Sequence, residues 1–349
     1  MLEWKNSITS FNSLKVIYWK DRFDLILKGE IPKPVSVTVD ATNVCNIHCQ
    51  FCDTAELKKE MQRTVSEEDL LFLADALMRL GVSSVHFSGA GEGLMHPAAG
   101  RFLRKLKDNG LDAGLITNGI FIDRFFDDIL YSCKWVGVSV DAANAETYGE
   151  LKNAAEMDFF KLINNMQRFV RERKEMKPAI TFKFLIHPLN YEEIYDAVVL
   201  AKSMNVDEVQ IRPCYSDSIY WFPNVVREII EEGRRAVELS TSKFHVNFIT
   251  HKYDNDFIRN KYERCEITPL AGLTFAADGN VYICSDLRYT EQGFLCPWRD
   301  IEQVYGSEKH KEMLKNLDVK KCPLQCKDSV YQGILENVFR EDKMMRKFI

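Results

Sequence analysis

The 349-residue sequence lacks any long hydrophobic run, and its net charge is only −5. No stretch approaches the roughly 18 consecutive apolar residues of a membrane-spanning helix. Charged residues also interrupt the N-terminal segment, where a signal peptide would have a continuous apolar stretch. The weak net charge argues against a general affinity for nucleic acid or anionic membranes. We therefore expect a cytoplasmic protein with neither of these partners.

The sequence also lacks internal repeats and low-complexity segments. With 46% hydrophobic and 28% charged residues, it has the composition of a globular protein with a sizeable core. Disulfides are rare in the cytoplasm, so its ten cysteines indicate either metal sites or scattered buried thiols. Their positions favour metal sites, because eight of the ten fall in two groups, at residues 45–52 and 265–326.

Residues 35–250 alternate strand-like and helix-like segments. Candidate strands begin near residues 35, 83, 112, 135, 179, 207 and 244, and amphipathic stretches separate them. The first such stretch begins at Ser66, with Asp69 completing a partial capping box, and stops at Gly81. About six βα units in series predict a parallel sheet covered by helices, either open or closed into a barrel. The functional site of such a sheet lies at the C-terminal ends of its strands.

After about residue 262 the pattern changes to two short strands joined by an Asp278–Gly279 turn. Irregular, cysteine-containing sequence follows to about residue 326, and then a closing helix. Such a small unit has too little core of its own, so a metal site would stabilise it. We expect three parts: a helical N-terminal segment (1–34), the βα domain (35–250) and a cysteine-rich module (251–349).

Cys45, Cys49 and Cys52 lie in the loop after the first predicted strand. Three thiolates in one loop, with no fourth nearby, leave a coordination position open, as a catalytic metal site requires. Structural zinc usually takes one closely spaced cysteine pair and a second pair further along the chain. A zinc knuckle or a set of unrelated thiols is the alternative interpretation.

The C-x3-C-x2-C spacing, with Phe51 directly before the last cysteine, resembles the signature of the radical SAM superfamily. The resemblance implies a partial (β/α)6 TIM-like barrel and a 4Fe-4S cluster held by these three cysteines. The open iron would bind S-adenosylmethionine (SAM), and an external one-electron donor such as flavodoxin or ferredoxin would reduce the cluster. Cleavage of SAM would then give a 5′-deoxyadenosyl radical, which abstracts a hydrogen atom from substrate.

The second predicted strand runs into "SGAGEGLMHP", which is similar to the family's Gly-Gly-Glu-Pro turn. The resemblance implies that Glu92 and the backbone around Gly91 hold the SAM amino group. Gly93 replaces the usual proline and makes the turn looser. A glycine-rich βα turn with a solvated glutamate is the alternative.

Four further residues resemble family positions that face SAM. Asn118, Ser139 and Asp141 end successive strands and would face the ribose and the methionine part; helix caps are the alternative for Asn118 and Asp141. Lys152 stands where an arginine often pairs with the SAM carboxylate, and a surface lysine is the alternative.

The second cysteine group resembles the start of the C-terminal SPASM or twitch module of radical SAM enzymes, because Gly279 lies between Cys265 and Cys284. That module holds auxiliary 4Fe-4S clusters. Five cysteines remain here, enough for one cluster, so the shorter twitch version fits better. Zinc in the same thiolates is the alternative, and Cys296 could replace one ligand. Four ligands would close the second cluster and favour an electron-transfer role; we assign Cys265, Cys284, Cys322 and Cys326.

Cys214 follows the sixth predicted strand and would lie at the same mouth. Its S–H could return a hydrogen atom to a substrate radical, as in epimerases of the family; a small buried residue is the alternative. Arg212, Tyr215 and Asp217 are placed to meet a polar substrate. Cys133 is interpreted as a core residue.

Two functions from different classes are compatible with these patterns. The first is a radical SAM enzyme that oxidises or epimerises a small polar substrate, such as a sugar or an aminocyclitol. Only about 35 residues precede the predicted barrel, which is short for the peptide-recognition domain of many family members, so peptide modification is the alternative. The second is a zinc- or cluster-stabilised binding protein without catalysis.

Overall fold

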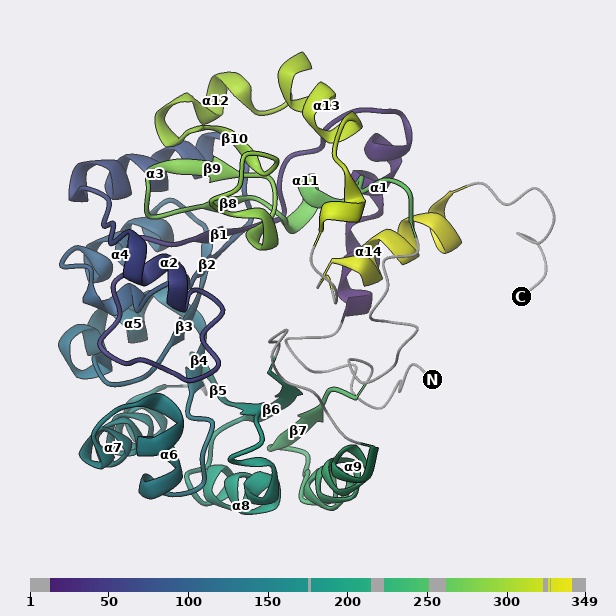
Figure 1. The fold of residues 1–349 in the computed structure, drawn as a ribbon. Helices are drawn as coiled ribbons and strands as arrows, with labels where there is room; N and C mark the ends of the chain where they lie inside the picture. The colour runs from purple at the N-terminus through teal and green to yellow at the C-terminus, as the bar shows by residue number, and fades with distance from the viewer. Residues whose placement is uncertain are drawn as a thin grey trace.

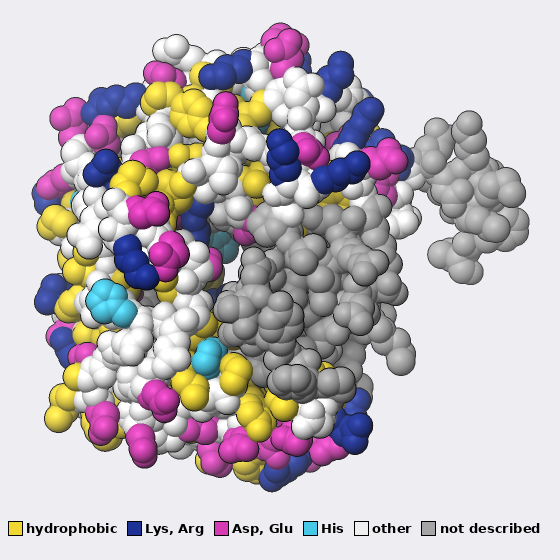
Figure 2. All heavy atoms as spheres, viewed as in Figure 1, with side chains coloured by type: hydrophobic (Ala, Val, Ile, Leu, Met, Phe, Trp, Pro, Cys, Tyr) yellow, Lys and Arg dark blue, Asp and Glu magenta, His cyan; other side chains and the backbone are white. Residues whose placement is uncertain are grey.

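The computed structural model describes residues 13–174, 177–214, 223–250, 262–322, 326 and 328–340. Its fold is α/β, with a mostly parallel sheet whose strands follow an open arc and whose helices lie on the outside of that arc (Figure 1). This arrangement is consistent with the expected partial barrel. The surface in Figure 2 carries acidic and basic side chains intermixed, in keeping with the weak net charge.

The sheet has ten strands in the order β10-β9-β8-β1-β2-β3-β4-β5-β6-β7. Neighbours from β1 to β7 pair in parallel and in sequence order, as βα units require. All seven predicted strands are confirmed. Their bounds are Ser36–Val39 (β1), Ser84–Phe87 (β2), Asp112–Thr117 (β3), Cys133–Ser139 (β4), Ala179–Ile186 (β5), Glu208–Pro213 (β6) and His245–Phe248 (β7).

The helices between these strands bury one apolar face against the sheet. In α3, the Ser66 hydroxyl accepts a hydrogen bond from Asp69 N at 3.0 Å, and Gly81 ends the helix with a φ of +73°, so both predicted boundaries are confirmed. Cys133 is buried in the core as expected. The covering helices are α3 (Glu67–Arg79), α4 (Ala99–Asp108), α5 (Phe126–Ser132), α6 (Ala145–Lys152), α7 (Glu156–Glu172), α8 (Ile194–Ser203) and α9 (Pro223–Val237).

The predicted C-terminal hairpin is confirmed, but it belongs to the same sheet as the βα units. Strand β8 (Thr274–Phe275) pairs in parallel with β1, while β9 (Asn280–Tyr282) and β10 (Phe294–Pro297) continue antiparallel. Gly279, with a φ of +83°, occupies the hairpin turn. The remaining C-terminal helices are α11 (Thr268–Ala271), α12 (Ile301–Val304), α13 (Glu308–Lys315) and α14 (Ser329–Ile334), followed by a π-helical turn (Leu335–Phe339).

The N-terminal part of the described chain packs against its C-terminal part. A 3-10 turn (Ser13–Trp19) leads into α1 (Lys20–Leu27). Phe23 of α1 is fully buried and stacks on Phe339, with ring centroids 4.5 Å apart. None of the helices in the described ranges is both long enough and apolar enough to cross a bilayer.

We expect Phe23→Ala to lower the free energy of unfolding by about 3–5 kcal/mol, because it opens a cavity under the Phe339 ring. Urea denaturation measures the change. Tyr18→Ala is the matched control, since Tyr18 is 87% exposed and its loss should cost no more than about 0.5 kcal/mol. Equal effects of the two substitutions would contradict the packing of α1 on the C-terminal turn.

Candidate active site

The loop after β1 brings Cys45, Cys49 and Cys52 to the rim of a large cavity. All three thiols are free of disulfides and only partly buried. Burial raises the pKa of Cys45 and of Cys49, although the nearby Lys152 ammonium opposes the rise at Cys49. Lys58 donates a hydrogen bond to the Cys52 sulfur at 3.1 Å. The structure therefore places the three predicted ligands together at the C-terminal ends of the strands.

The cysteine loop, residues 40–54, is tied on one side to the turn after β2. Glu92 N donates to Val44 O at 2.9 Å, and the Thr54 hydroxyl donates to Ala90 O at 2.8 Å. A Cβ on Gly91 would lie 2.3 Å from Val44 O, so only glycine allows this approach. This close approach explains why the turn predicted to bind SAM has a glycine at position 91.

On its other side the cysteine loop is tied to the C-terminal end of α6. His48 N donates to Lys152 O and Gln50 N donates to Leu151 O, both at 3.0 Å. Asn153 Nδ2 donates to His48 O at 2.8 Å. The last carbonyls of a helix have no partner within the helix, and here the loop supplies the donors.

Glu92 is buried, so the alternative of a solvated glutamate is wrong. Its carboxylate accepts hydrogen bonds from Thr117 Oγ1 at 2.8 Å, from Asn118 N at 2.7 Å and from Leu94 N at 3.1 Å. Burial raises the pKa of this carboxyl group, and these donors oppose the rise. Asn118 in turn donates to Asn46 Oδ1 at 2.8 Å. Glu92 therefore connects the ends of β2 and β3 beneath the cysteine loop.

Asp141 and Lys152 form a buried ion pair. The second Asp141 oxygen accepts from Leu185 N at 2.6 Å, and Asp141 adopts a positive φ of 61°, which is rare outside glycine. Burial alone would lower the pKa of Lys152, but Asp141 and Cys49 raise it. The surface-lysine alternative is thus wrong. The cap alternative for Asp141 is also wrong, because Asn144 caps α6.

The cavity has a volume of about 1370 Å³ and is lined from both cysteine groups, by Cys45, Cys49 and Cys52 on one side and by Cys322 on the other. Ser139 lines it at the end of β4, and so does Cys214 after β6. Burial raises the pKa of Cys214 to about 12, so its thiol stays protonated at neutral pH. Tyr215 and Asp217 lie outside the described residues.

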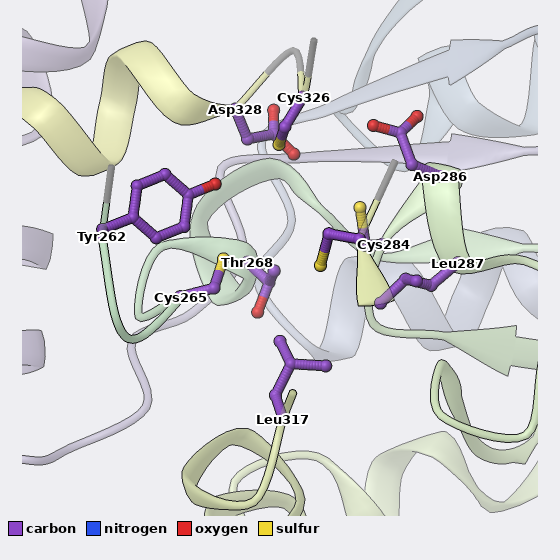
Figure 3. A pocket seen from close by; sticks show the side chains of 10 residues that line it. Tyr262, Cys265, Thr268, Cys284, Asp286, Leu287, Leu317, Cys326 and Asp328 are labelled. Carbon is purple, nitrogen blue, oxygen red and sulfur yellow. The ribbon is translucent and has the colours of Figure 1, made fainter. Parts of the chain in front are cut away.

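The four assigned C-terminal cysteines face one small enclosed space, together with Tyr262, Thr268 and Leu317 (Figure 3). Burial raises the pKa of Cys326, and the neighbouring Tyr262 hydroxyl opposes the rise. Cys296, the alternative ligand, instead lies in β10 within the core and is not among the residues lining this space. Among the described residues, no group of three or more His, Cys, Asp or Glu side chains has the arrangement that would hold a single metal ion.

Sequence reasoning missed Arg288, which connects the two cysteine regions. It follows the 3-10 turn after Cys284 and pairs with Asp53 at 3.3 Å and with Asp40 at 3.8 Å, near the two ends of the cysteine loop. Sequence reasoning also missed Trp135, which lines the large cavity. The signal for Trp135 was the pair of glycines Gly114 and Gly137, where a Cβ would lie 2.4 Å and 2.9 Å from the indole.

Residues 39–209 match the family model of the radical SAM superfamily. A PqqA peptide cyclase of Methylorubrum populi is 29% identical over 187 residues, which cover 52% of this chain and 46% of that relative. A probable GTP 3′,8-cyclase of Methanocaldococcus jannaschii is 20% identical over 75% of this chain and 84% of that relative. The chain spans about half the length of the PqqA peptide cyclases that it matches.

Two solved structures share the fold. Streptococcus suis SuiB bound to the precursor peptide SuiA is 14% identical, with a TM-score of 0.66 over 95% of this chain and 80% of that one. Native anSMEcpe with bound AdoMet is 16% identical, with a TM-score of 0.59 over 83% of this chain and 86% of that one.

We expect Lys152→Met to lower the free energy of unfolding by about 3–5 kcal/mol, because it leaves the Asp141 carboxylate buried without its cation. Urea denaturation measures the loss, and adding Asp141→Asn should recover part of it. Lys20→Met is the control: Lys20 pairs with Asp24 at the surface, and such a pair contributes about 1 kcal/mol or less. A loss at Lys152 no larger than that at Lys20 would contradict a buried pair.

Proposed function

We propose that the protein cleaves SAM reductively to modify a peptide substrate, because residues 39–209 match the family model of the radical SAM superfamily. The observation that carries the proposal is the set of three thiols, Cys45, Cys49 and Cys52, which one loop presents to a cavity of about 1370 Å³. Pockets for small ligands usually measure about 300–1000 Å³. The larger space suits SAM and part of a peptide together.

The donor set fits a 4Fe-4S cluster with one open iron, because three thiols face the cavity and thiolates are the usual ligands of such clusters. When bound and reduced by an external donor such as flavodoxin or ferredoxin, the cluster supplies the electron that cleaves SAM to methionine and a 5′-deoxyadenosyl radical. The chain itself orients the cysteines through the ties of their loop to the β2 turn and to α6.

The residues assigned to SAM divide into two roles in this proposal. Ser139, Asn118 and Gly91 line the cavity, and we assign them to contacts with the cofactor. Glu92 acts as a positioning residue, because its carboxylate already accepts three hydrogen bonds from the protein. Lys152 remains the candidate for the SAM carboxylate, with its charge held in place by Asp141.

A peptide substrate is supported by one relative, which is named a PqqA peptide cyclase, and by one structure that shares the fold, SuiB bound to the precursor peptide SuiA. This support favours peptide modification over the expected sugar or aminocyclitol. A small polar substrate remains the second candidate, because other relatives are probable GTP 3′,8-cyclases. Oxidation, epimerisation and bond formation are all reactions that follow from hydrogen abstraction.

We also propose that Cys265, Cys284, Cys322 and Cys326 hold a second 4Fe-4S cluster. Four thiols facing one enclosed space supply a complete ligand set, and Cys322 lines the large cavity as well. A closed cluster has no free iron for substrate, so its role would be to accept or relay an electron at the edge of the active site.

Anaerobic reconstitution with iron and sulfide tests the proposal. We expect about eight irons per chain, four for each cluster, and 5′-deoxyadenosine from SAM with a reductant. Cys49→Ala should abolish 5′-deoxyadenosine formation and leave about four irons. Cys133→Ala, which removes a core thiol away from both sites, should keep both properties. Zinc in either site without SAM cleavage would instead indicate a non-catalytic binding protein.

Cys214 is the proposed hydrogen-atom donor, since a protonated thiol can give its hydrogen atom to a substrate carbon radical. The sulfur radical left behind would take an electron from the external donor and a proton from water. We expect Cys214→Ala to keep SAM cleavage and to lose the epimerised product, measured by chiral analysis and by deuterium uptake from heavy water. An unchanged product would contradict the donor role and would indicate that Cys214 serves only in packing.

A further inference from the structure

The inner face of β6 presents two polar side chains to the cavity, from Gln210 and Arg212. The two residues are two positions apart in the strand and therefore point to the same side of the sheet. In the parallel register, Gln210 lies opposite Lys183 of β5, and Arg212 lies opposite Leu185. Arg212 is thus the member of the pair nearer the C-terminal end, where the cysteine loop lies.

Arg212 has no anionic partner among the described residues. Its Nε is buried without a hydrogen bond, and no ion pair or other hydrogen bond of the guanidinium is found there. Asp141 and Asp53 attract it only from a distance, and each already pairs with another cation, Lys152 or Arg288. Burial accordingly lowers the pKa of Arg212.

Arg212 is half-buried, so its guanidinium has lost part of its water and has gained no acceptor, which is costly. The Gln210 side-chain oxygen is in the complementary situation, since it is buried without a donor. One strand therefore offers the cavity a charged donor that lacks an acceptor and, next to it, an acceptor that lacks a donor. A ligand with a carboxylate beside an N–H or O–H group would satisfy both.

We propose, on the basis of the function proposed above, that Arg212 and Gln210 form a subsite for a carboxylate of the substrate. Arginine binds carboxylates through two parallel hydrogen bonds, which orients the bound group as well as holding it. The cofactor also has a carboxylate, but in the proposed function it binds beside the cysteine loop, which is tied to the β2 turn and to α6. Strand β6 lies further along the sheet, beyond β5. The subsite would hold the substrate across the cavity from those ties.

The test uses the reconstituted holoprotein loaded with SAM and two probes that differ in one charge. N-acetylglutamate α-methylamide carries a single carboxylate, and N-acetylglutamine α-methylamide is its neutral counterpart. Titration calorimetry should show that the wild-type protein binds the carboxylate probe more tightly than the amide. Arg212→Met should weaken the carboxylate probe roughly 10- to 100-fold and leave the amide unchanged. Arg101→Met, which removes an exposed guanidinium on α4, is the charge control and should change neither.

Gln210→Glu provides a second variant that retains Arg212. It would place a carboxylate beside the guanidinium, so we expect it to stabilise the fold and to abolish the preference for the carboxylate probe. This variant, together with the wild-type comparison of the two probes, decides the proposal even where Arg212→Met does not fold.

The outcomes separate this inference from the function on which it rests. Equal binding of both probes to the wild-type protein overturns the subsite. A loss of SAM affinity in Arg212→Met, with probe binding unchanged, would assign the guanidinium to the cofactor and overturn it as well. Formation of 5′-deoxyadenosine from SAM is measured separately, so failure of the subsite leaves the proposed SAM chemistry standing.

Discussion

The site depends on the backbone hydrogen bonds that hold the cysteine loop between two βα connections. Glu92 N reaches the loop from the β2 turn, and the last carbonyls of α6 accept from His48 and Gln50. A loop that must present three thiols in one direction has no regular structure of its own to fix them. Its neighbours supply that rigidity, and the close approach at Gly91 makes it possible.

The charged groups beneath the loop follow from the same constraint. Because the loop covers the strand ends, Glu92, Asp141 and Lys152 are all buried, and each needs internal partners. Glu92 takes three donors, and Asp141 pairs with Lys152. Arg288 adds a tie from the C-terminal cysteine region to the cysteine loop. In this network Arg212 stands out as a cavity-lining cation for which the described chain supplies no anion.

Much of the fold could be predicted because its signals are local. Strand periodicity, the Ser66 cap, Gly81 and the Asp278–Gly279 turn depend on residues a few positions apart, and the structure confirms each of them. The pairing of β8 with β1 could not be predicted in this way, since it joins residues more than 200 positions apart. The sequence analysis predicted an appended C-terminal module, and the structure adds that its hairpin extends the same sheet.

The sequence by itself determined which residues are candidates for the proposed chemistry: three cysteines spaced within one loop, a glycine-rich turn with Glu92, and a second cysteine group after residue 262. Spacing is a local property, and a ligand set within one loop can be identified from it. The tertiary structure decided how the remaining groups are used. Lys152 became a buried partner of Asp141, Cys296 became a core residue, and Arg212 kept a charge that no described residue pairs with. Burial and pairing depend on strands that only folding brings together.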